Sequence, residues 1–355
     1  MSEIDSHIKM VNSKGPLKRL PPFLWALVLF LLLIGSSWAG WLDSYTQLVI
    51  LFIGINIIMS ASLNLINGYM GEFSCGHAGF MAVGAYVTSL LTVWFFTSGS
   101  VFGPALLNPY WAILLFPLLL LIGGLAAALA GLMIAVPSFR TRGDYLAIIT
   151  LAANYIIKSA IENIQVIGGA RGFMGMSRVV NGMEAVWEIP WMLIWTGIFV
   201  ALTVVVIQRF IRSTYGQGVI AIREDEIAAE IMGINIRKMK MIAFMLSSGL
   251  AGVAGGLLAH VLGYINPGSF TIMKSTEAMV MVYLGGMGSL SGSVLSAVLF
   301  TLLLEVLRPL ELFKWVIVPL LLFFLMLFRP EGLLGHRELA DVFPGLKRFY
   351  RSEGK

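Results

Sequence analysis

Charge is scarce in this chain, and so are the residues that build redox, metal and phosphate sites. Only 12% of its 355 residues are Asp, Glu, Lys or Arg, whereas soluble domains carry about 25%. The single cysteine, Cys75, excludes an internal disulfide and any CxxC motif. No phosphate loop of the G-x-x-x-x-G-K-S/T type occurs, which argues against ATP binding in the usual way. We therefore expect no cofactor.

Catalytic constellations are missing as well. The histidines are too scattered to suggest a metal site; they are His7, His77, His260 and His336. No pair of carboxylates and no set of Ser, His and Asp stands out as catalytic. The net charge of +5 comes from basic residues that lie between apolar runs and at the chain ends, where they orient membrane spans. The sequence thus predicts neither an enzyme nor a nucleic-acid binder.

Apolar sequence, in contrast, is abundant, because 58% of the residues are hydrophobic. Runs long enough to cross a bilayer, which takes about 20 residues, occur about ten times. The predicted spans are 22–42, 45–66, 76–97, 110–136, 145–167, 190–211, 239–263, 274–289, 290–307 and 312–328. The sequence therefore predicts an all-α polytopic membrane protein with about ten transmembrane helices, some of them broken, in one domain over 22–328.

Basic residues predict the orientation of these spans. They gather in segments 1–21 and 329–355 and in the connections that contain Arg140, Arg142 and 213–238, whereas the connection 98–109 has none. By the positive-inside rule, both chain ends are expected in the cytoplasm. The first apolar run has two interpretations, a signal peptide cleaved after Ser37-Trp38-Ala39 or an uncleaved span. Its length favours the span.

A polar island, Thr214–Lys240, interrupts the apolar sequence. It contains four consecutive charged residues, Arg223, Glu224, Asp225 and Glu226. Its isoleucines recur with helical spacing at Ile220, Ile227, Ile231 and Ile234. Ser213 or Thr214 can cap the start, Gly233 can end the helix, and Asn235 can cap the next one. The island is predicted to be a short amphipathic helix between two spans, a structure suited to docking.

Two glycine-rich breaks fall in different halves of the chain. The first spans Asn64–Phe80 and contains Gly68, Gly71, Gly76 and Gly79, with Glu72 and His77 close by. The second includes Gly285 and Gly288, and Gly285-x-Met287-Gly288-x-x-Ser291 echoes Gly68-x-Met70-Gly71-x-x-Ser74. A broken helix in lipid survives only where protein or a water cavity satisfies its backbone. The echo suggests an internal repeat around a central passage.

Small residues and a polar face mark other helices. Gly123, Ala127 and Gly131 in the fourth span, and Ser248, Gly252 and Gly256 in the seventh, have the four-residue spacing that allows close helix packing. In the fifth span Asn154, Lys158 and Glu162 share one face. They could line the passage or form an interhelical ion pair near the outer surface, and we favour the ion pair.

Several runs together resemble one known family. Ala221-Ile222-Arg223-Glu224-Asp225-Glu226, followed by Ala228-Ala229 and Gly233-Ile234, resembles the EAA-type coupling loop of ABC importer permeases. The stretch from Asn64 to Phe80 resembles the signature N-L-x-x-G-Y-x-G-Q-x-S-L-G-H-A-x-F of the M-type permease subunit of branched-chain amino acid transporters. Arg140–Leu151, Met281–Gly292 and Arg329–Gly335 resemble further runs of that family. Two departures are Glu72, where the family usually has Gln, and Cys75, where it usually has Leu.

The resemblance implies a multi-pass permease of the bacterial inner membrane. Its partners would be two ABC ATPase subunits, a second homologous permease, a periplasmic or extracellular amino-acid-binding protein and membrane lipid. The implied coupling residues are Arg223, Glu224, Asp225, Glu226, Ala228, Ala229 and Gly233. The residues expected along the translocation pathway are Asn64, Gly68, Gly71, Glu72, His77, Gly285 and Gly288. The outer connection near 168–189 would be either a landing surface for the binding protein or a plain flexible loop.

A second hypothesis stays open from the sequence. An ion- or proton-coupled secondary transporter usually has a functional charge at membrane depth. The candidate ionisable groups are Glu72, His77, Glu277 and Glu305, of which Glu72 and Glu277 fit this role best. The cargo of either transporter is not fixed by the residues, although the resemblance implies a branched-chain or related hydrophobic amino acid.

Overall fold

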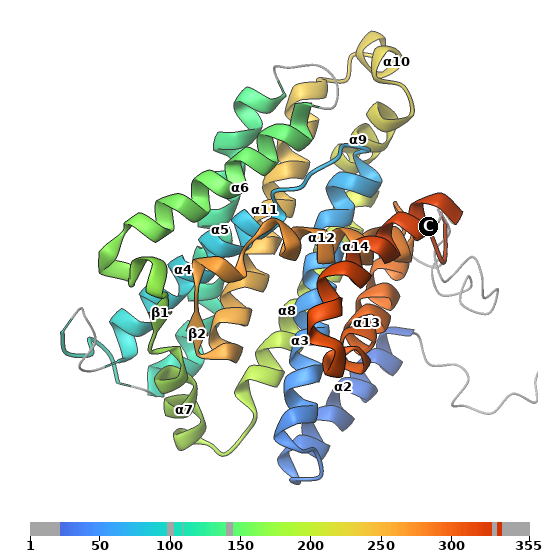
Figure 1. Cartoon of the computed structure of the whole chain (residues 1–355). Coiled ribbons are helices and arrows are strands. Elements are labelled where there is room, and N and C mark those ends of the chain that lie inside the picture. Colours follow the sequence, from blue (N-terminus) through green and yellow to red (C-terminus); the bar gives the residue numbers. More distant parts are fainter. Residues whose placement is uncertain (1–21, 98–102, 109, 140–144, 329–331, 336–355) are drawn as a thin grey trace, which may run out of the picture.

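The computed structural model describes residues 22–97, 103–108, 110–139, 145–328 and 332–335 (Figure 1). Its helices are α2 (Pro22–Trp38), α3 (Ser44–Asn64), α4 (His77–Phe96), α5 (Tyr110–Ser138), α6 (Tyr145–Asn163), α7 (Met176–Val186), α8 (Trp191–Arg212), α9 (Thr214–Glu224), α10 (Glu226–Ile231), α11 (Ile236–Leu262), α12 (Ile272–Gly285), α13 (Leu290–Val306) and α14 (Glu311–Phe328). Each predicted span coincides with one of these helices. The remaining three, α7, α9 and α10, lie in the predicted connections.

Six helices of the described part are long and apolar enough to cross a bilayer: α3 with its extension to Tyr69, α4, α5, α6, α8 and α11. The chain is therefore a polytopic helical membrane protein. The helices α12 and α13 have only 14 and 17 residues, whereas about 20 are needed for a full crossing. The total of ten spans and the cytoplasmic position of both ends stay predictions, and the two terminal segments lie outside the described residues.

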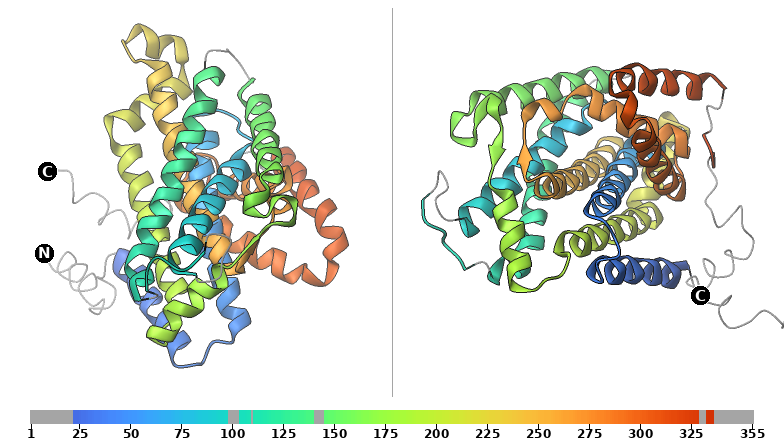
Figure 2. Two further views of the ribbon diagram at one scale, coloured as in Figure 1. Left: turned by 90° about the vertical axis from the view of Figure 1, so that its left-hand side faces the viewer. Right: turned by 60° about the horizontal axis from the view of Figure 1, so that its bottom comes forward.

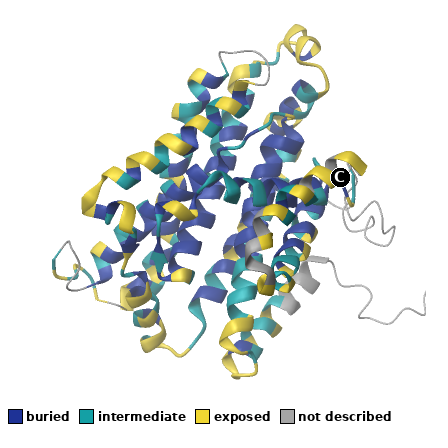
Figure 3. Ribbon diagram, in the orientation of Figure 1, coloured by how far each residue is buried: buried dark blue, intermediate teal, exposed yellow. Residues whose placement is uncertain are grey.

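The helices α3 and α11 form the centre of the bundle (Figure 2, right). In each of them 72% of an apolar stretch of 18 residues is buried, compared with 28–39% of the corresponding stretch in α5, α6 and α8. Buried residues accordingly form a band through the middle of the molecule (Figure 3). Gly252 of α11 lies so close to Ala127 of α5 that a side chain on it would collide, and Gly131 meets Ser248 in the same way. The small-residue pattern is thus confirmed as close packing between these two helices.

The connection after α6 is structured. The strand β1 (Phe173–Met174) pairs antiparallel with β2 (Tyr264–Ile265), and α7 follows it. Gly168, Gly169, Gly172 and Gly175 all have positive φ, which lets the chain turn sharply before and after β1. The predicted turn at Asn266 is present, since its side chain accepts a hydrogen bond from the Gly268 N–H. This region lies at the end of the molecule opposite α10 (Figure 1).

The polar face of α6 differs from the prediction. Lys158 pairs with Glu162 one turn along the same helix, at 3.6 Å, so the ion pair is not interhelical. Asn154 is buried and faces Gly79 of α4. A lysine at this position reaches its own helix neighbour more easily than another helix, because residues four apart share a face. Asp144, the expected cap of α6, and Arg140 and Arg142 lie outside the described residues.

Both glycine-rich breaks interrupt helices. After α3 the chain forms a π-helical turn, η2 (Leu65–Tyr69), and then an irregular stretch before α4 begins at His77. The second break separates α12 from α13. Gly71, Gly286 and Gly288 have φ of 73°, 108° and 81°, a region in which other residues are strained. The sequence pattern therefore located both breaks.

Candidate functional site

The polar island folds into two short helices, α9 and α10, rather than the single helix that the isoleucine spacing predicted. Asp225 lies between them in an extended conformation, with φ of −157°. Its Oδ1 accepts hydrogen bonds from the N–H groups of Ile227 and Ala228, at 2.9 and 3.0 Å. Asp225 is thus the cap that starts α10. The prediction of one continuous apolar stripe was wrong, because this extended residue ends α9 and α10 starts in a new direction.

The predicted ends of the island are confirmed. Ser213 Oγ accepts from the Gly216 N–H at the start of α9, and Asn235 Oδ1 accepts from the Lys238 N–H at the start of α11. Gly233 has φ of 84° and ends α10. Capping residues at both ends therefore fix where the island leaves and rejoins the bundle. We call the segment from Ser213 to Asn235 the elbow.

The helix α10 lies at one extreme of the molecule and is exposed (Figures 1 and 3). Three large apolar side chains there face solvent: Ile227, Ile231 and Met232 are 71%, 80% and 81% exposed. Of the predicted coupling residues, Glu224, Asp225, Glu226, Ala228 and Gly233 are also exposed, whereas Ala229 is buried. These three side chains form an exposed apolar group on a short protruding helix, and larger exposed apolar patches are typical of protein interaction sites.

Arg223, in contrast, points into the bundle. Its Nη1 donates a hydrogen bond of 3.0 Å to the carbonyl oxygen of Gly68, in the first break. Its guanidinium also pairs with Glu224. A side chain on Gly71 would collide with the stem of Arg223, so the break and α9 are in close contact. Arg223 therefore connects the elbow to the first glycine break.

A second connection runs through Lys240, which the sequence analysis did not single out. Lys240 Nζ lies 2.6 Å from Glu72 Oε1 and 3.2 Å from Glu226 Oε2. Its side chain is only 9% exposed, whereas those of Glu72 and Glu226 are 21% and 54% exposed. We call these three residues the Glu72–Lys240–Glu226 cluster. The only sequence signal for it was a lysine one turn inside a long apolar helix.

The two glycine breaks meet at Asn64. Its Oδ1 accepts a hydrogen bond from the Gly288 N–H at 2.9 Å. Its Nδ2 donates to the Ser289 carbonyl oxygen at 2.9 Å and to Ser293 Oγ at 2.8 Å. Gly68 lies so close to the backbone nitrogen of Gly288 that no side chain fits between them. The structure thus brings together Asn64, Gly68 and Gly288 of the predicted pathway residues.

Gly285 and His77 have other surroundings. Gly285 packs on the backbone of Gly292, and its carbonyl oxygen accepts from the Leu334 N–H at 3.2 Å. His77 is fully buried, with Nε2 2.8 Å from Ser62 Oγ. It therefore joins α4 to α3 outside the contact between the two breaks. Among the described residues, no group of three or more His, Cys, Asp or Glu side chains could hold a metal ion.

The chain is similar to known proteins over most of its length. The family model described as "Branched-chain amino acid transport system / permease component" matches residues 45–328. The permease protein LivM of the high-affinity branched-chain amino acid transport system of Escherichia coli is 31% identical over 86% of this chain and 73% of its own length. A probable LivM permease of Methanocaldococcus jannaschii is 24% identical over 87% of this chain and 98% of its own length.

A different subunit type matches more weakly. The LivH permease of Salmonella typhimurium is 29% identical over 56% of this chain and 61% of its own length. No solved structure matches the chain. The family match covers every helix described above except α2, and so includes both breaks and the elbow. The chain belongs to the family of permease components of branched-chain amino acid transport systems.

Proposed function

We propose that this chain is one of two permease subunits of an ATP-driven ABC importer and that the elbow couples it to the ATPase. The observation that carries the proposal is the double connection from the elbow to the first break, through Arg223 of α9 and through Glu226 of α10 in the Glu72–Lys240–Glu226 cluster. A displacement of α10 by a partner would act on residues 68–72 through both. Those residues contact the second break through Gly68 and Gly288, so the breaks would move together.

The remaining partners are proposed on the basis of family membership. We place the chain in the bacterial inner membrane with both ends and the elbow in the cytoplasm. Two ATPase subunits, one for each permease, would bind the elbow side. A homologous second permease is supported by the two permease types, LivM and LivH, among the relatives. A soluble binding protein would deliver the cargo to the opposite end, where β1, β2 and α7 lie.

The proposed cargo is a branched-chain or related hydrophobic amino acid, as the names of the relatives indicate. A secondary transporter receives no support from the residues on which that hypothesis depended. Glu72 is paired with Lys240, Glu277 with Lys274 at 2.9 Å, and Glu305 with Arg308 at 3.5 Å. None of these three carboxylates is an isolated charge.

The coupling role is best tested on the exposed apolar face of α10. Replacing Glu224 and Asp225 with Arg should abolish uptake, but it would also remove the α10 cap and the Arg223 pair. The double change Ile231→Ser and Met232→Ser leaves both in place. Fully burying such a side chain contributes about 1.5–3 kcal/mol, so the loss of two should weaken ATPase binding by roughly 100-fold or more.

The measurement is copurification of the ATPase subunits from detergent-solubilised membranes, together with amino acid uptake. Met174→Ser is the matched control for ATPase copurification alone, because Met174 is 69% exposed at the opposite end of the molecule, on the surface proposed to receive the binding protein. We expect the ATPase to be lost from the α10 variant and kept by the control. An ATPase that stays bound with normal uptake after both α10 changes would refute the coupling role.

A further inference from the structure

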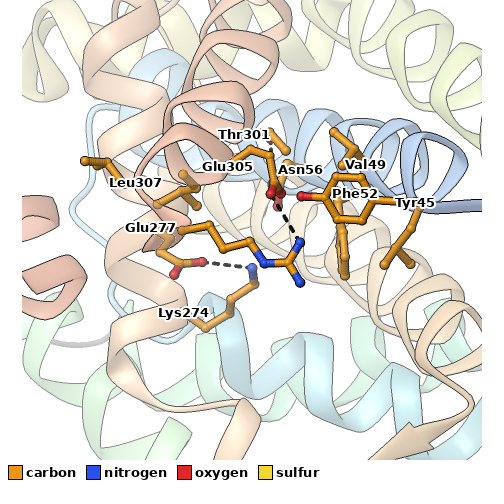
Figure 4. Close-up of a pocket in the computed structure, with 12 residues that line it drawn as sticks. Tyr45, Val49, Phe52, Asn56, Lys274, Glu277, Thr301, Glu305 and Leu307 are labelled. Atoms are coloured by element: carbon orange, nitrogen blue, oxygen red, sulfur yellow. Dashed lines mark hydrogen bonds and ion pairs between the residues drawn. The ribbon is translucent and has the colours of Figure 1, made fainter. Parts of the chain in front are cut away.

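A cavity of about 310 Å³ lies between α3, α12 and α13 (Figure 4). Small-molecule pockets range over about 300–1,000 Å³, so this cavity is large enough for one small solute. It is lined at the start of α3 and α12 and at the end of α13. The start of α3 lies at the end of the molecule opposite α10 (Figure 1). By the predicted topology, the cavity is therefore nearer the outer face.

One wall of the cavity is apolar. Tyr45, Leu48, Val49 and Phe52 come from successive turns of one face of α3. Leu304 and Leu307 add apolar surface from α13 and the turn after it. Asn56 is buried at the inner end, where its Nδ2 donates to Thr301 Oγ1 at 2.9 Å. This wall suits an aliphatic or aromatic side chain of a ligand, with little polar surface to oppose it.

The other wall contains charges of both signs. Lys274 and Glu277 of α12 form an ion pair at 2.9 Å, with side chains 23% and 12% exposed. Glu305 and Arg308 form a second pair at 3.5 Å, and the Arg308 guanidinium lies 4.9 Å from the centre of the Tyr45 ring. Figure 4 shows the Glu277 carboxylate beside the Lys274 ammonium, and the Glu305 carboxylate nearer Asn56, and all four charged residues line the cavity. Two cations and two carboxylates therefore face one small space beside an apolar wall.

We propose that this cavity binds a free, zwitterionic, apolar amino acid. The substrate α-carboxylate would approach Lys274 and Arg308, its α-ammonium would approach Glu277 and Glu305, and its side chain would contact the α3 wall. The four charges sum to zero, so a net-neutral zwitterion keeps the cavity neutral. An amine or an acid alone would leave a charge without a partner, which costs most beside Lys274 and Glu277, whose side chains are 23% and 12% exposed, and less beside Arg308, which is 60% exposed.

The cavity is joined to the coupling region by the same helices. The helix α12 has Lys274 and Glu277 near its start and ends at Gly285 in the second break, and α3 connects Tyr45 at the cavity to Asn64 at the first break. A ligand that changes the spacing of α3 and α12 at the cavity therefore acts on the contact between the breaks. This inference rests on the proposed importer function for its biological meaning, although binding itself can be tested separately.

The test is photolabelling of the full chain, purified with the subunits that copurify with it and placed in lipid nanodiscs without the binding protein, using the diazirine analogue L-photo-leucine. We expect label in the tryptic peptides that contain α3 and α13. Excess L-leucine should prevent it, whereas leucinamide, which lacks the carboxylate, and 4-methylpentanoate, which lacks the ammonium, should compete at least about tenfold more weakly. The loss of one hydrogen bond to a charged group lowers affinity by about tenfold or more.

Variants of the α12 pair separate binding from folding. Lys274→Met and Glu277→Gln should each lower labelling about tenfold or more. The double variant Lys274→Glu with Glu277→Lys keeps an ion pair for folding but exchanges the positions of the two charges. It should also lower labelling. Lys158→Met and Glu162→Gln are the matched control, because they disrupt an ion pair of the same kind on α6. Those variants should label like the unmodified chain.

The outcomes distinguish this inference from the proposed function. If label appears at the cavity with the expected competition but no ATPase copurifies, the cavity stands and the importer proposal fails. If the ATPase copurifies and the label is absent, lies elsewhere or survives the charge exchange, the cavity proposal is overturned. A cavity that is covered by the second permease subunit in the complex would give this second result.

Discussion

The change Lys240→Met tests whether the Glu72–Lys240–Glu226 cluster transmits movement of the elbow. Methionine keeps a flexible apolar stem and removes only the ammonium, so packing at this buried position changes little. The change leaves α10 and its exposed face in place. It disrupts the connection to Glu72 while the one through Arg223 to Gly68 stays. We therefore expect a complex that retains its ATPase subunits but takes up less amino acid for each ATP that it hydrolyses.

The distances give the size of the effect. With an effective dielectric constant of about 20, charges 2.6 Å apart attract by about 6 kcal/mol. Desolvation of Lys240 offsets most of this, which leaves about 1–3 kcal/mol for its pair with Glu72. The pair with Glu226 should contribute less than about 1 kcal/mol, because Glu226 is 54% exposed. A loss of 1–3 kcal/mol corresponds to roughly a fivefold to hundredfold shift between two conformations.

The assay measures amino acid uptake and ATP hydrolysis in the same proteoliposomes and takes their ratio. We expect Lys240→Met to lower uptake per ATP at least fivefold. Lys238→Met is the control, since Lys238 is exposed on the first turn of the same helix. Glu72→Gln should have a smaller effect because the amide still accepts a hydrogen bond from Lys240. An unchanged ratio in Lys240→Met would show that this cluster does not transmit the movement.

Three further predictions concern other contacts. Asn64→Ala removes three hydrogen bonds between the breaks and should destabilise the protein by about 2–4 kcal/mol, seen as a lower melting temperature of the purified complex; an unchanged melting temperature would contradict this. Gly252→Leu collides with Ala127 and should prevent assembly of the bundle. The control Gly103→Leu, at a site with open space, should yield normal amounts of monodisperse protein in size-exclusion chromatography despite backbone strain. Equal yields of the two variants would refute the packing argument. Asp225→Ala removes the α10 cap at a cost of about 1 kcal/mol, so the amides of α10 should exchange hydrogen faster, and unchanged exchange would exclude a role of the cap in its stability.

The sequence predicted the features that depend on neighbouring residues. Apolar windows located the helices of the bundle, because a span must bury its backbone polar groups within itself. The small residues around Gly252 located a close contact between α11 and α5, because small side chains let helix backbones approach. Capping chemistry at Ser213, Gly233 and Asn235 set the limits of the elbow. Each of these features follows from a few adjacent residues and needs no knowledge of distant ones.

The features that the sequence did not predict join residues far apart in the chain. Glu72 and Lys240 are separated by 168 positions, and neither position has a local pattern that names the other. The sequence analysis singled out Glu72 as a departure from the family signature, but its ion pair with Lys240 emerged only from the structure. Asp225 was identified as part of a charged run, and its role as a cap emerged only from the extended backbone between α9 and α10.

The position of Arg223 and Lys240 bears on how a short helix could move a membrane bundle. A helix is stiff along its axis, so a push on α10 is passed to α9 and α11, between which it is held. Arg223 on α9 and Lys240 on α11 both bind residues 68–72, and these residues are irregular or π-helical rather than regular α-helix. Irregular backbone absorbs changes in φ and ψ more readily than a packed helix. The first break is therefore the place where we expect motion of the elbow to become a change in helix spacing. Gly68 packs directly against the backbone of Gly288, so we expect a displacement of the first break to displace the second break as well.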